Sequence, residues 1–234
     1  MLVHYLGSFT DSLLITDEKG NPIGIVVGLE IIKNVFEDPH EHLFEKTVGE
    51  IMSTEELLKI TPRTRFKDLI ETWKQTRRAY SIMKNQYGWY SAISARKILE
   101  IGANSKTGLT VADLPRKKII TFSYDDTFGK IINLMLTNRT RKLLFKNTSG
   151  FISDRIIIQK IAQELRYLKD VENFLDIKFE EPFKLADATS VSENMNLADL
   201  SKMMFGMLHP YVMTKDQVYS PWDVCLALLS DGVK

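Results

Sequence analysis

Apolar and polar positions follow a short pattern near the start of the chain. Apolar runs with strand character lie at 13–16 and 23–27, and the polar stretch between them contains Gly20, which suits a tight turn. Apolar residues then recur at helical spacing over 29–36. A two-stranded hairpin followed by one helix cannot bury its own apolar faces. The pattern therefore predicts one unit of a repeated architecture.

The corner where the second strand meets the helix recurs three more times. Val27 marks the first corner, and Ser94, Ser153 and Ser220 mark the others. Val27 and Ser153 are 126 residues apart, and so are Ser94 and Ser220. A fixed interval of this kind is stronger evidence for a fold than local propensity. It predicts a pair of repeats that has been duplicated.

An amphipathic helix and an extended run precede three of the corners. Phe66 and Phe128 each begin a set of apolar residues at positions i, i+3, i+4 and i+7, and a looser set begins at Leu197. Such a stripe is typical of a helix that buries one face. The full unit is therefore β-α-β-β-α. Residues 1–9 are too few for both an opening strand and a helix, so we expect the first repeat to be truncated at its N-terminus.

This unit resembles the cystathionine-β-synthase (CBS) domain family. The resemblance rests on the order of elements, the Thr-Val-Gly-Glu-Ile-Met opening at 47–52, the hairpin from Asp17 to Val26, and the Ser-x-x-Asp corner at 220–223. CBS domains come in pairs called Bateman modules, so the resemblance implies an α/β fold of four tandem repeats, paired by pseudo-twofold symmetry. The predicted modules are 1–105, with repeats at about 1–36 and 47–102, and 106–234, with repeats at about 109–168 and 183–231.

The resemblance also implies a ligand site. CBS domains bind adenosyl ligands in a cleft between paired repeats, with a Ser or Thr hydroxyl and an Asp carboxylate at the corner. Helix N-terminal N–H groups suit an anion, and a carboxylate can accept both ribose hydroxyls. Ser220 and Asp223 form the complete pair, and we expect Val191 and Tyr211 to line the base pocket. An ordinary N-terminal helix cap is the alternative explanation for Ser220 and Asp223, and it stays open.

The other three corners fit the pattern less well. Ser94 is followed by Lys97 where a carboxylate is required, and Ser153 is followed there by an isoleucine. Glu30 supplies a carboxylate, but it follows a valine rather than a hydroxyl residue. We therefore place the best site in the second module and keep Ser94, Lys97, Ser153 and Glu30 as weaker candidates for ligand binding.

Composition narrows the classes of partner. With 31 basic and 30 acidic residues, the net charge of +1 gives no reason to expect nucleic acid or an anionic membrane. DNA binding through the basic residues of 155–169 is disfavoured for the same reason. No apolar run approaches the ~20 residues of a membrane helix, and no signal sequence is apparent, so a cytoplasmic location is expected. The single Cys225 lies among apolar residues and should be a packed hydrophobe.

Catalysis and metal binding have little support. The four histidines, His4, His40, His42 and His209, show no spacing to a nucleophile, so we expect no catalytic residue and no enzyme. His40 and His42 lack further metal ligands at a matching spacing, so a solvated linker is favoured over a metal site. Residues 102–108 contain Gly, Lys and Thr, but their order is not that of a P-loop.

Two functional hypotheses remain. The first is a regulatory protein that binds an adenosine-containing nucleotide (AMP, ADP, ATP or S-adenosylmethionine) and signals its occupancy to an unidentified partner protein. The second is a structural or interaction module without a functional ligand site. No cofactor is required by either. Broad apolar stripes, such as Met203, Met204 and Met207, also predict either a homodimer or two modules packed face to face within one chain.

Overall fold

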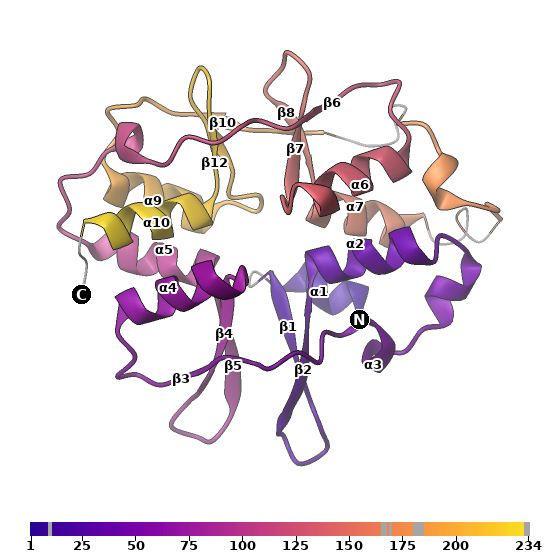
Figure 1. Ribbon diagram of the computed structural model, residues 1–234, viewed down its shortest axis with the longest axis horizontal. Coiled ribbons are helices and arrows are strands. Elements are labelled where there is room, and N and C mark those ends of the chain that lie inside the picture. Colours follow the sequence, from indigo (N-terminus) through magenta and orange to yellow (C-terminus); the bar gives the residue numbers. More distant parts are fainter. Residues whose placement is uncertain (9–10, 165–167, 169, 180–184, 232–234) are drawn as a thin grey trace. The chain divides into compact units, whose positions relative to one another are not determined.

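The repeated order of elements is present in a computed structural model of the chain (Figure 1), which describes all residues except 9–10, 165–167, 169, 180–184 and 232–234. The first repeat contains α1 (Leu2–Gly7), β1 (Ser12–Thr16), β2 (Pro22–Val27) and α2 (Gly28–Glu37). It is followed by a 3-10 turn (Glu41–Glu45) and α3 (Val48–Ile51). As predicted, α1 stands where a complete repeat would have both a strand and a helix.

The second, third and fourth repeats each follow the order β-α-β-β-α. The second is β3 (Lys59–Ile60), α4 (Phe66–Thr76), β4 (Tyr80–Lys84), β5 (Tyr90–Ser94) and α5 (Ala95–Asn104). The third is β6 (Thr121–Phe122), α6 (Phe128–Thr137), β7 (Lys142–Phe145), β8 (Gly150–Ser153) and α7 (Asp154–Gln163). The fourth is β10 (Thr189–Ser190), α9 (Leu197–Gly206), β11 (Val212–Met213), β12 (Val218–Tyr219) and α10 (Pro221–Ser230). Residues 183 and 184, where the fourth repeat was predicted to begin, lie outside the described residues.

Short elements join these repeats. Two 3-10 turns lie at Val111–Asp113 and Phe174–Asp176, and β9 covers Ala186–Asp187. No described helix is long and apolar enough to cross a membrane.

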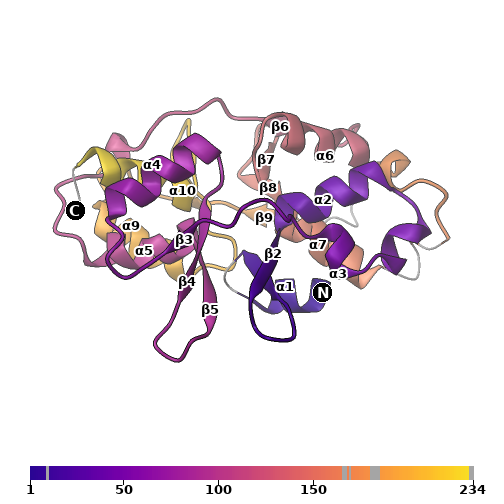
Figure 2. The same ribbon diagram turned by 60° about the horizontal axis from the view of Figure 1, so that its bottom comes forward.

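The strands of these three repeats pair in the same way. In the second repeat β3 is parallel to β4, and β4 is antiparallel to β5, with Tyr80 opposite Ser94. The third and fourth repeats have the same two pairings, and β9 adds a fourth strand beside β8. Identical topology in segments far apart in the sequence confirms the repetition that the apolar pattern predicts. Figures 1 and 2 show the second-repeat hairpin β4–β5 extending away from its helix α4.

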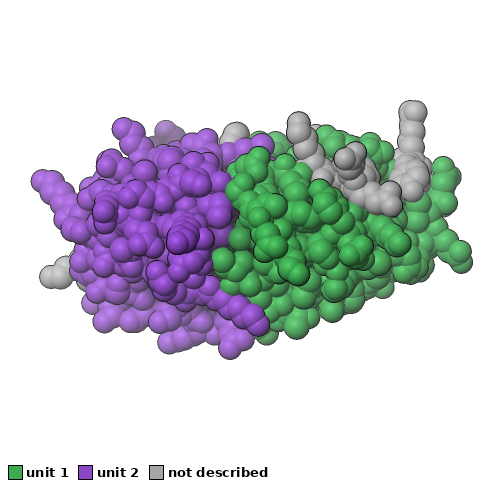
Figure 3. Space-filling model, turned by 90° about the horizontal axis from the view of Figure 1, so that it is seen from above, with its two compact units in different colours: residues 1–15, 23–55, 119–187 green, residues 16–22, 56–118, 188–234 purple. Residues whose placement is uncertain are grey.

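The chain divides into two compact units (Figure 3). Unit 1 contains residues 1–15, 23–55 and 119–187, and unit 2 contains residues 16–22, 56–118 and 188–234. Unit 1 therefore combines most of the first and third repeats, and unit 2 combines the second and fourth. These units do not coincide with the segments 1–105 and 106–234, so the division of the chain into two sequential modules stays a prediction.

Helices from both halves of the chain pack against one another inside each unit. In unit 1, α2 contacts α6 and α7; in unit 2, α5 contacts α9 and α10, and α10 also contacts α4. The approach of α5 to α9 is close, since a Cβ atom at Gly102 would lie 2.4 Å from the Oγ of Ser201. A glycine is therefore required at this helix crossing.

The core of unit 2 covers the methionine stripe of α9. Met204 is fully buried, and Met203 and Met207 pack at the edge of the same apolar cluster. Aliphatic and aromatic residues of four helices make up its centre: Phe66, Leu69, Ile70, Trp73, Ile98, Leu99, Leu197, Leu200, Val224, Leu228. The stripe that was expected to mark a partner surface is thus occupied within the unit.

Candidate ligand site

The most complete corner of the chain lies where β12 meets α10 in unit 2. Ser220 has an extended backbone and precedes the helix, and Pro221 takes the first helical position, where its missing N–H group costs no hydrogen bond. The Ser220 backbone N–H group donates to Asp223 Oδ2 at 2.8 Å, and the Ser220 hydroxyl donates to the same oxygen at 2.7 Å. Ser220 and Asp223 therefore cap the helix, as the alternative sequence interpretation predicts.

The second carboxylate oxygen of Asp223 has different surroundings. The side chain is only 1% exposed, yet Oδ1 has no hydrogen-bond partner in the described part of the chain. The ammonium group of Lys117 lies 2.5 Å from Oδ1 as an ion pair, without the geometry of a hydrogen bond. Buried carboxylate oxygens normally accept hydrogen bonds. Oδ1 can therefore accept hydrogen bonds from a ligand.

The turn between β11 and β12 holds Lys117 in place. Lys117 donates its backbone N–H group to the side-chain oxygen of Gln217 at 2.9 Å, and Arg116 donates to Asp216 at 3.1 Å. Thr214 donates its backbone N–H group to the carbonyl oxygen of Gln217 at 3.0 Å. We call the set Lys117, Thr214, Gln217, Ser220 and Asp223 the Asp223 site.

Thr214, in the turn that holds Lys117, has a second buried polar atom without a partner. Its Oγ1 is buried and has no hydrogen-bond partner among the described residues. The neighbouring Tyr219 is also buried, and burial raises the pKa of its hydroxyl, although the positive charge of Arg116 opposes the shift. Tyr219 is therefore a neutral phenol near pH 7, and the charges of the Asp223 site come from its carboxylate and from Lys117.

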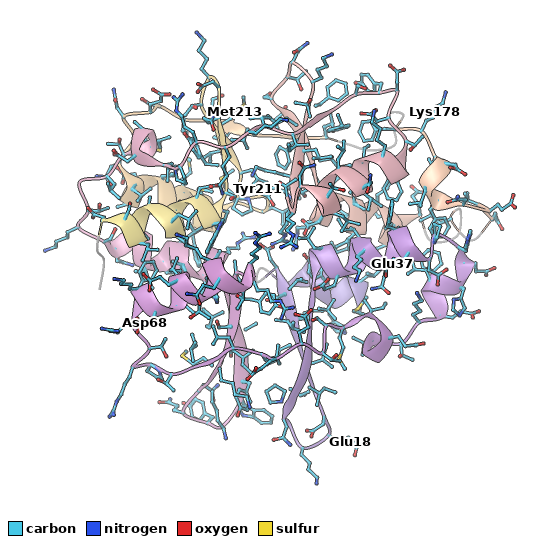
Figure 4. All side chains as sticks on the ribbon, viewed as in Figure 1. Glu18, Glu37, Asp68, Lys178, Tyr211 and Met213 are labelled. Atoms are coloured by element: carbon cyan, nitrogen blue, oxygen red, sulfur yellow. The ribbon has the colours of Figure 1, made fainter. Side chains whose placement is uncertain are left out.

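Val191 and Tyr211, which were predicted to line a base pocket, belong to the sheet of the same repeat. Val191 follows β10 and donates its backbone N–H group to the carbonyl oxygen of Met213 at 2.8 Å. Tyr211 directly precedes β11 and is buried, and Figure 4 shows it with Met213 on this strand segment. Their side chains thus belong to the fold that carries Asp223, and their contact with a base stays a prediction.

The weaker candidates are placed at other corners. In unit 2, Ser94 is buried at the start of α5, and Lys97 is half-exposed and pairs with Glu100 at 2.6 Å. In unit 1, Ser153 is fully buried and accepts a hydrogen bond from the backbone N–H group of Ile156 at 3.3 Å, as an ordinary helix cap. Glu30 lies in the first turn of α2. A ligand role for these four residues is untested.

A buried ion cluster lies beside Ser153, around the aspartate that directly follows it. Asp154 is fully buried, and its Oδ2 accepts a hydrogen bond from Arg141 Nε at 2.6 Å. Arg141 also donates to the hydroxyl of Tyr5 at 3.1 Å and pairs with Asp11 at 3.4 Å. Burial raises the pKa of Asp154, while the Arg141 charge opposes the rise. These charges compensate one another, so the cluster is suited to holding α1 and α7 together rather than to binding a ligand.

Lys117 and Thr214 were not predicted as site residues. Lys117 lies shortly before β6, far from Asp223 in the sequence, and no local spacing connects them. Thr214 directly follows β11 and shares no sequence pattern with Ser220 and Asp223. The sequence alone could not identify these two residues, because their place depends on the contact between the segment of Lys117 and the turn between β11 and β12.

Histidines and acidic residues do not gather into a metal site in the described residues. His42 Nδ1 lies 2.9 Å from Asp38 Oδ2, and His40 Nδ1 lies 2.5 Å from the carbonyl oxygen of Glu172. These two histidines are thus engaged by other groups of unit 1.

Solved structures resemble this fold, among them the following two. Protein MJ1225 of Methanocaldococcus jannaschii, described as a proposed archaeal homolog of g-AMPK, matches with a TM-score of 0.77 and 14% identity over 96% of this chain and 90% of that one. An uncharacterized conserved protein of Pyrococcus horikoshii matches with a TM-score of 0.56 and 9% identity over 95% and 93%. No protein-family model matches the chain, and no curated protein matches it by sequence. Identities this low show the fold alone, and that fold is the predicted α/β fold of tandem CBS-type repeats.

Proposed function

We propose that this protein is a non-catalytic regulatory protein that binds an adenosine-containing nucleotide at the Asp223 site and signals its occupancy to a partner protein. The observation that carries the proposal is the buried Oδ1 atom of Asp223, which lacks a hydrogen-bond partner in the described chain. The two hydroxyls of a ribose are donors that such an oxygen can accept. The ion pair with Lys117 compensates the charge of Oδ1, and a ligand that supplies well-aligned hydrogen bonds to this buried oxygen gains affinity.

The charges of the site favour a small phosphorylated ligand. Lys117 and Arg116 lie on one segment beside Asp223 and can attract an anion. Pro221 lacks an N–H group at the start of α10, which leaves fewer backbone donors for phosphates. A nucleoside monophosphate is therefore favoured over a triphosphate.

The fold comparison supports a regulatory rather than an enzymatic role. The protein MJ1225 is described as related to g-AMPK, and its fold matches nearly the whole of this chain. On the basis of this similarity, we propose that the present chain also senses a nucleotide. A regulated partner protein, a homodimer and a cytoplasmic location belong to the same proposal.

A structural module without a ligand is the second candidate. The capping hydrogen bonds of Ser220 and the ion pair with Lys117 give Asp223 a role in folding even without a ligand. On this hypothesis the unused acceptor capacity of Oδ1 has no function.

Titration calorimetry of the wild-type protein with adenosine, AMP, ATP and S-adenosylmethionine tests the proposal. In the Asp223→Ala variant, a ribose ligand loses charge-assisted hydrogen bonds worth about 1.5–3 kcal/mol, which lowers its affinity roughly ten- to a hundredfold. The variant also loses its helix cap, at a cost of about 1 kcal/mol in unfolding free energy.

The capping residue Asp113 supplies the matched control. It accepts hydrogen bonds from the backbone N–H group of Thr110 at 2.8 Å and from the Thr110 hydroxyl at 3.0 Å, in the same arrangement as at Asp223. Asp113→Ala should leave the ligand affinity unchanged. If the wild-type protein binds none of the four ligands, or if Asp223→Ala binds them equally well, the structural hypothesis is correct instead.

A further inference from the structure

The unused oxygen of Asp223 is covered by a group that a ligand would have to displace. The Lys117 ammonium lies 2.5 Å from Oδ1, where the donors of a ribose would also have to lie. The Asp223 side chain is 1% exposed, whereas the Lys117 side chain is 47% exposed. The lysine therefore covers the buried carboxylate from the solvent side.

The backbone of this lysine is fixed, but its side chain has room to move. The backbone N–H group of Lys117 is tied to Gln217, and the neighbouring Arg116 is tied to Asp216 and lies 3.7 Å from Glu193. The four-carbon stem of lysine is flexible, and half of this one lies in solvent. The ammonium group can therefore leave Oδ1 without a change in the fold, while its Cα stays beside the site.

We propose that Lys117 determines the specificity of the Asp223 site by making it selective for a phosphorylated nucleoside over the uncharged nucleoside. The inference rests on the proposed function and goes beyond it by assigning the selectivity to one residue. An uncharged nucleoside that binds Oδ1 breaks the ion pair and offers the displaced ammonium no new partner. A nucleoside monophosphate offers its phosphate to the same ammonium, so one ion pair replaces another.

This exchange also explains why the site has a lysine rather than an arginine. An arginine can hold a carboxylate through two parallel N–H donors and leave it little capacity for a ligand. At Asp154 in unit 1 both oxygens are already engaged, since Arg141 Nε donates to Oδ2 and the Arg155 backbone N–H group donates to Oδ1. A single ammonium leaves Oδ1 with unused capacity and can be released. The two buried aspartates therefore differ in whether their cation can be exchanged for a ligand.

The ratio of the dissociation constants of adenosine and AMP, measured by calorimetry at low ionic strength, tests the inference. For the wild-type protein we expect AMP to bind roughly ten- to a hundredfold more tightly than adenosine. Lys117→Met keeps an apolar stem but removes the charge, so AMP should bind more weakly, adenosine should bind as well or better, and the ratio should approach one. Lys117→Gln, which retains a donor for Oδ1, should also lower the ratio and serves if Lys117→Met does not fold.

Lys118→Met is the matched control, because Lys118 is the exposed neighbour and its loss changes the net charge equally. It should leave the ratio unchanged. If Lys117→Met and Lys117→Gln keep the wild-type ratio, or if Lys118→Met lowers it as much, the inference is wrong while the proposed function stands. If the wild-type protein binds neither ligand, the proposed function fails and the inference fails with it.

Discussion

At the scale of single residues, Asp223 combines two roles that the sequence presents as alternatives. Its Oδ2 caps α10 through Ser220, and its Oδ1 faces Lys117 without a hydrogen bond. A Ser-x-x-Asp pattern at a helix start therefore does not distinguish a cap from a ligand site, because one carboxylate has an oxygen for each. Ser153 shows the other outcome, a buried serine that caps α7 and has no carboxylate three residues later.

The thiol of Cys225 permits a prediction about reactivity. The residue is fully buried in α10, and burial raises the pKa of the thiol, so almost none of it is thiolate at neutral pH. We expect the native protein to react with a disulfide reagent such as 5,5′-dithiobis(2-nitrobenzoate) at least a hundredfold more slowly than a free thiol (on the order of the protection that burial gives).

Unfolding with urea provides the control for this prediction. Because the chain has one cysteine, the denatured protein should release one equivalent of product rapidly. Rapid reaction of the native protein would show that the N-terminal part of α10, which also carries Asp223, opens easily.

At the scale of secondary-structure elements, the apolar pattern predicted which helices and strands exist better than it predicted their ends. The helices beginning at Phe66, Phe128 and Leu197 start where their stripes start. The extended run predicted before Phe66 contains only the short strand Lys59–Ile60, which pairs with Ile82 and Met83 of the longer strand β4. Helix stripes are local signals, whereas strand ends depend on residues distant in the sequence.

The same difference explains why the candidate site was only half predicted. Ser220 and Asp223 lie in one turn of helix, and their contact follows from sequence spacing. Lys117 and Thr214 each form a backbone hydrogen bond with Gln217. The Lys117 bond forms only because the segment before β6 packs against the turn between β11 and β12. Tertiary contacts of this kind have no periodic signature.

The ion cluster of unit 1 permits a prediction about stability. Arg141→Met removes the principal charge partner of the buried Asp154, and the loss of one partner from a buried pair costs about 3–5 kcal/mol in unfolding free energy. Urea unfolding should show this loss as a lower midpoint. Lys97→Met, which breaks the exposed pair with Glu100, is the control and should change the unfolding free energy by less than about 0.5–1 kcal/mol.

The destabilisation of Arg141→Met should depend on pH. Burial already raises the pKa of Asp154 in the folded protein above its value in the unfolded chain, and removal of Arg141 raises it further. The folded variant therefore holds a proton that the unfolded chain has released, and its stability falls as the pH rises from the unfolded pKa through the folded one. The loss should be smallest at acidic pH and reach its full size above the folded pKa. A loss that is independent of pH between 4 and 8 would show that Arg141 acts through packing instead.

At the scale of the whole chain, each compact unit takes helices from both halves of the sequence. In unit 2, the apolar faces of α4 and α5 meet those of α9 and α10 in one core. In unit 1, the helix α2 lies so close to Asp154 of α7 that a Cβ atom at Gly28 would overlap its carboxylate. The sequential modules 1–105 and 106–234 therefore have large apolar helix faces that only the other half covers within a unit.

This arrangement predicts that neither half folds alone as a monomer. The helices α4 and α5 contribute Phe66, Ile70, Trp73 and Leu99 to a core whose other side comes from the second half. Exposure of apolar surface to water costs about 25 cal/mol for each Å². Summed over the apolar helix faces of one half, this cost exceeds the free energy of unfolding of an ordinary domain, about 5–15 kcal/mol. Residues 1–105 and 106–234, produced separately, should therefore aggregate, self-associate or unfold. When they are produced together they should form a one-to-one complex that unfolds in a single cooperative transition. Size-exclusion chromatography with light scattering and thermal unfolding followed by circular dichroism distinguish these outcomes. A separate half that is monomeric and unfolds cooperatively would mean that the sequential modules, rather than the two compact units, are the folding units of this chain.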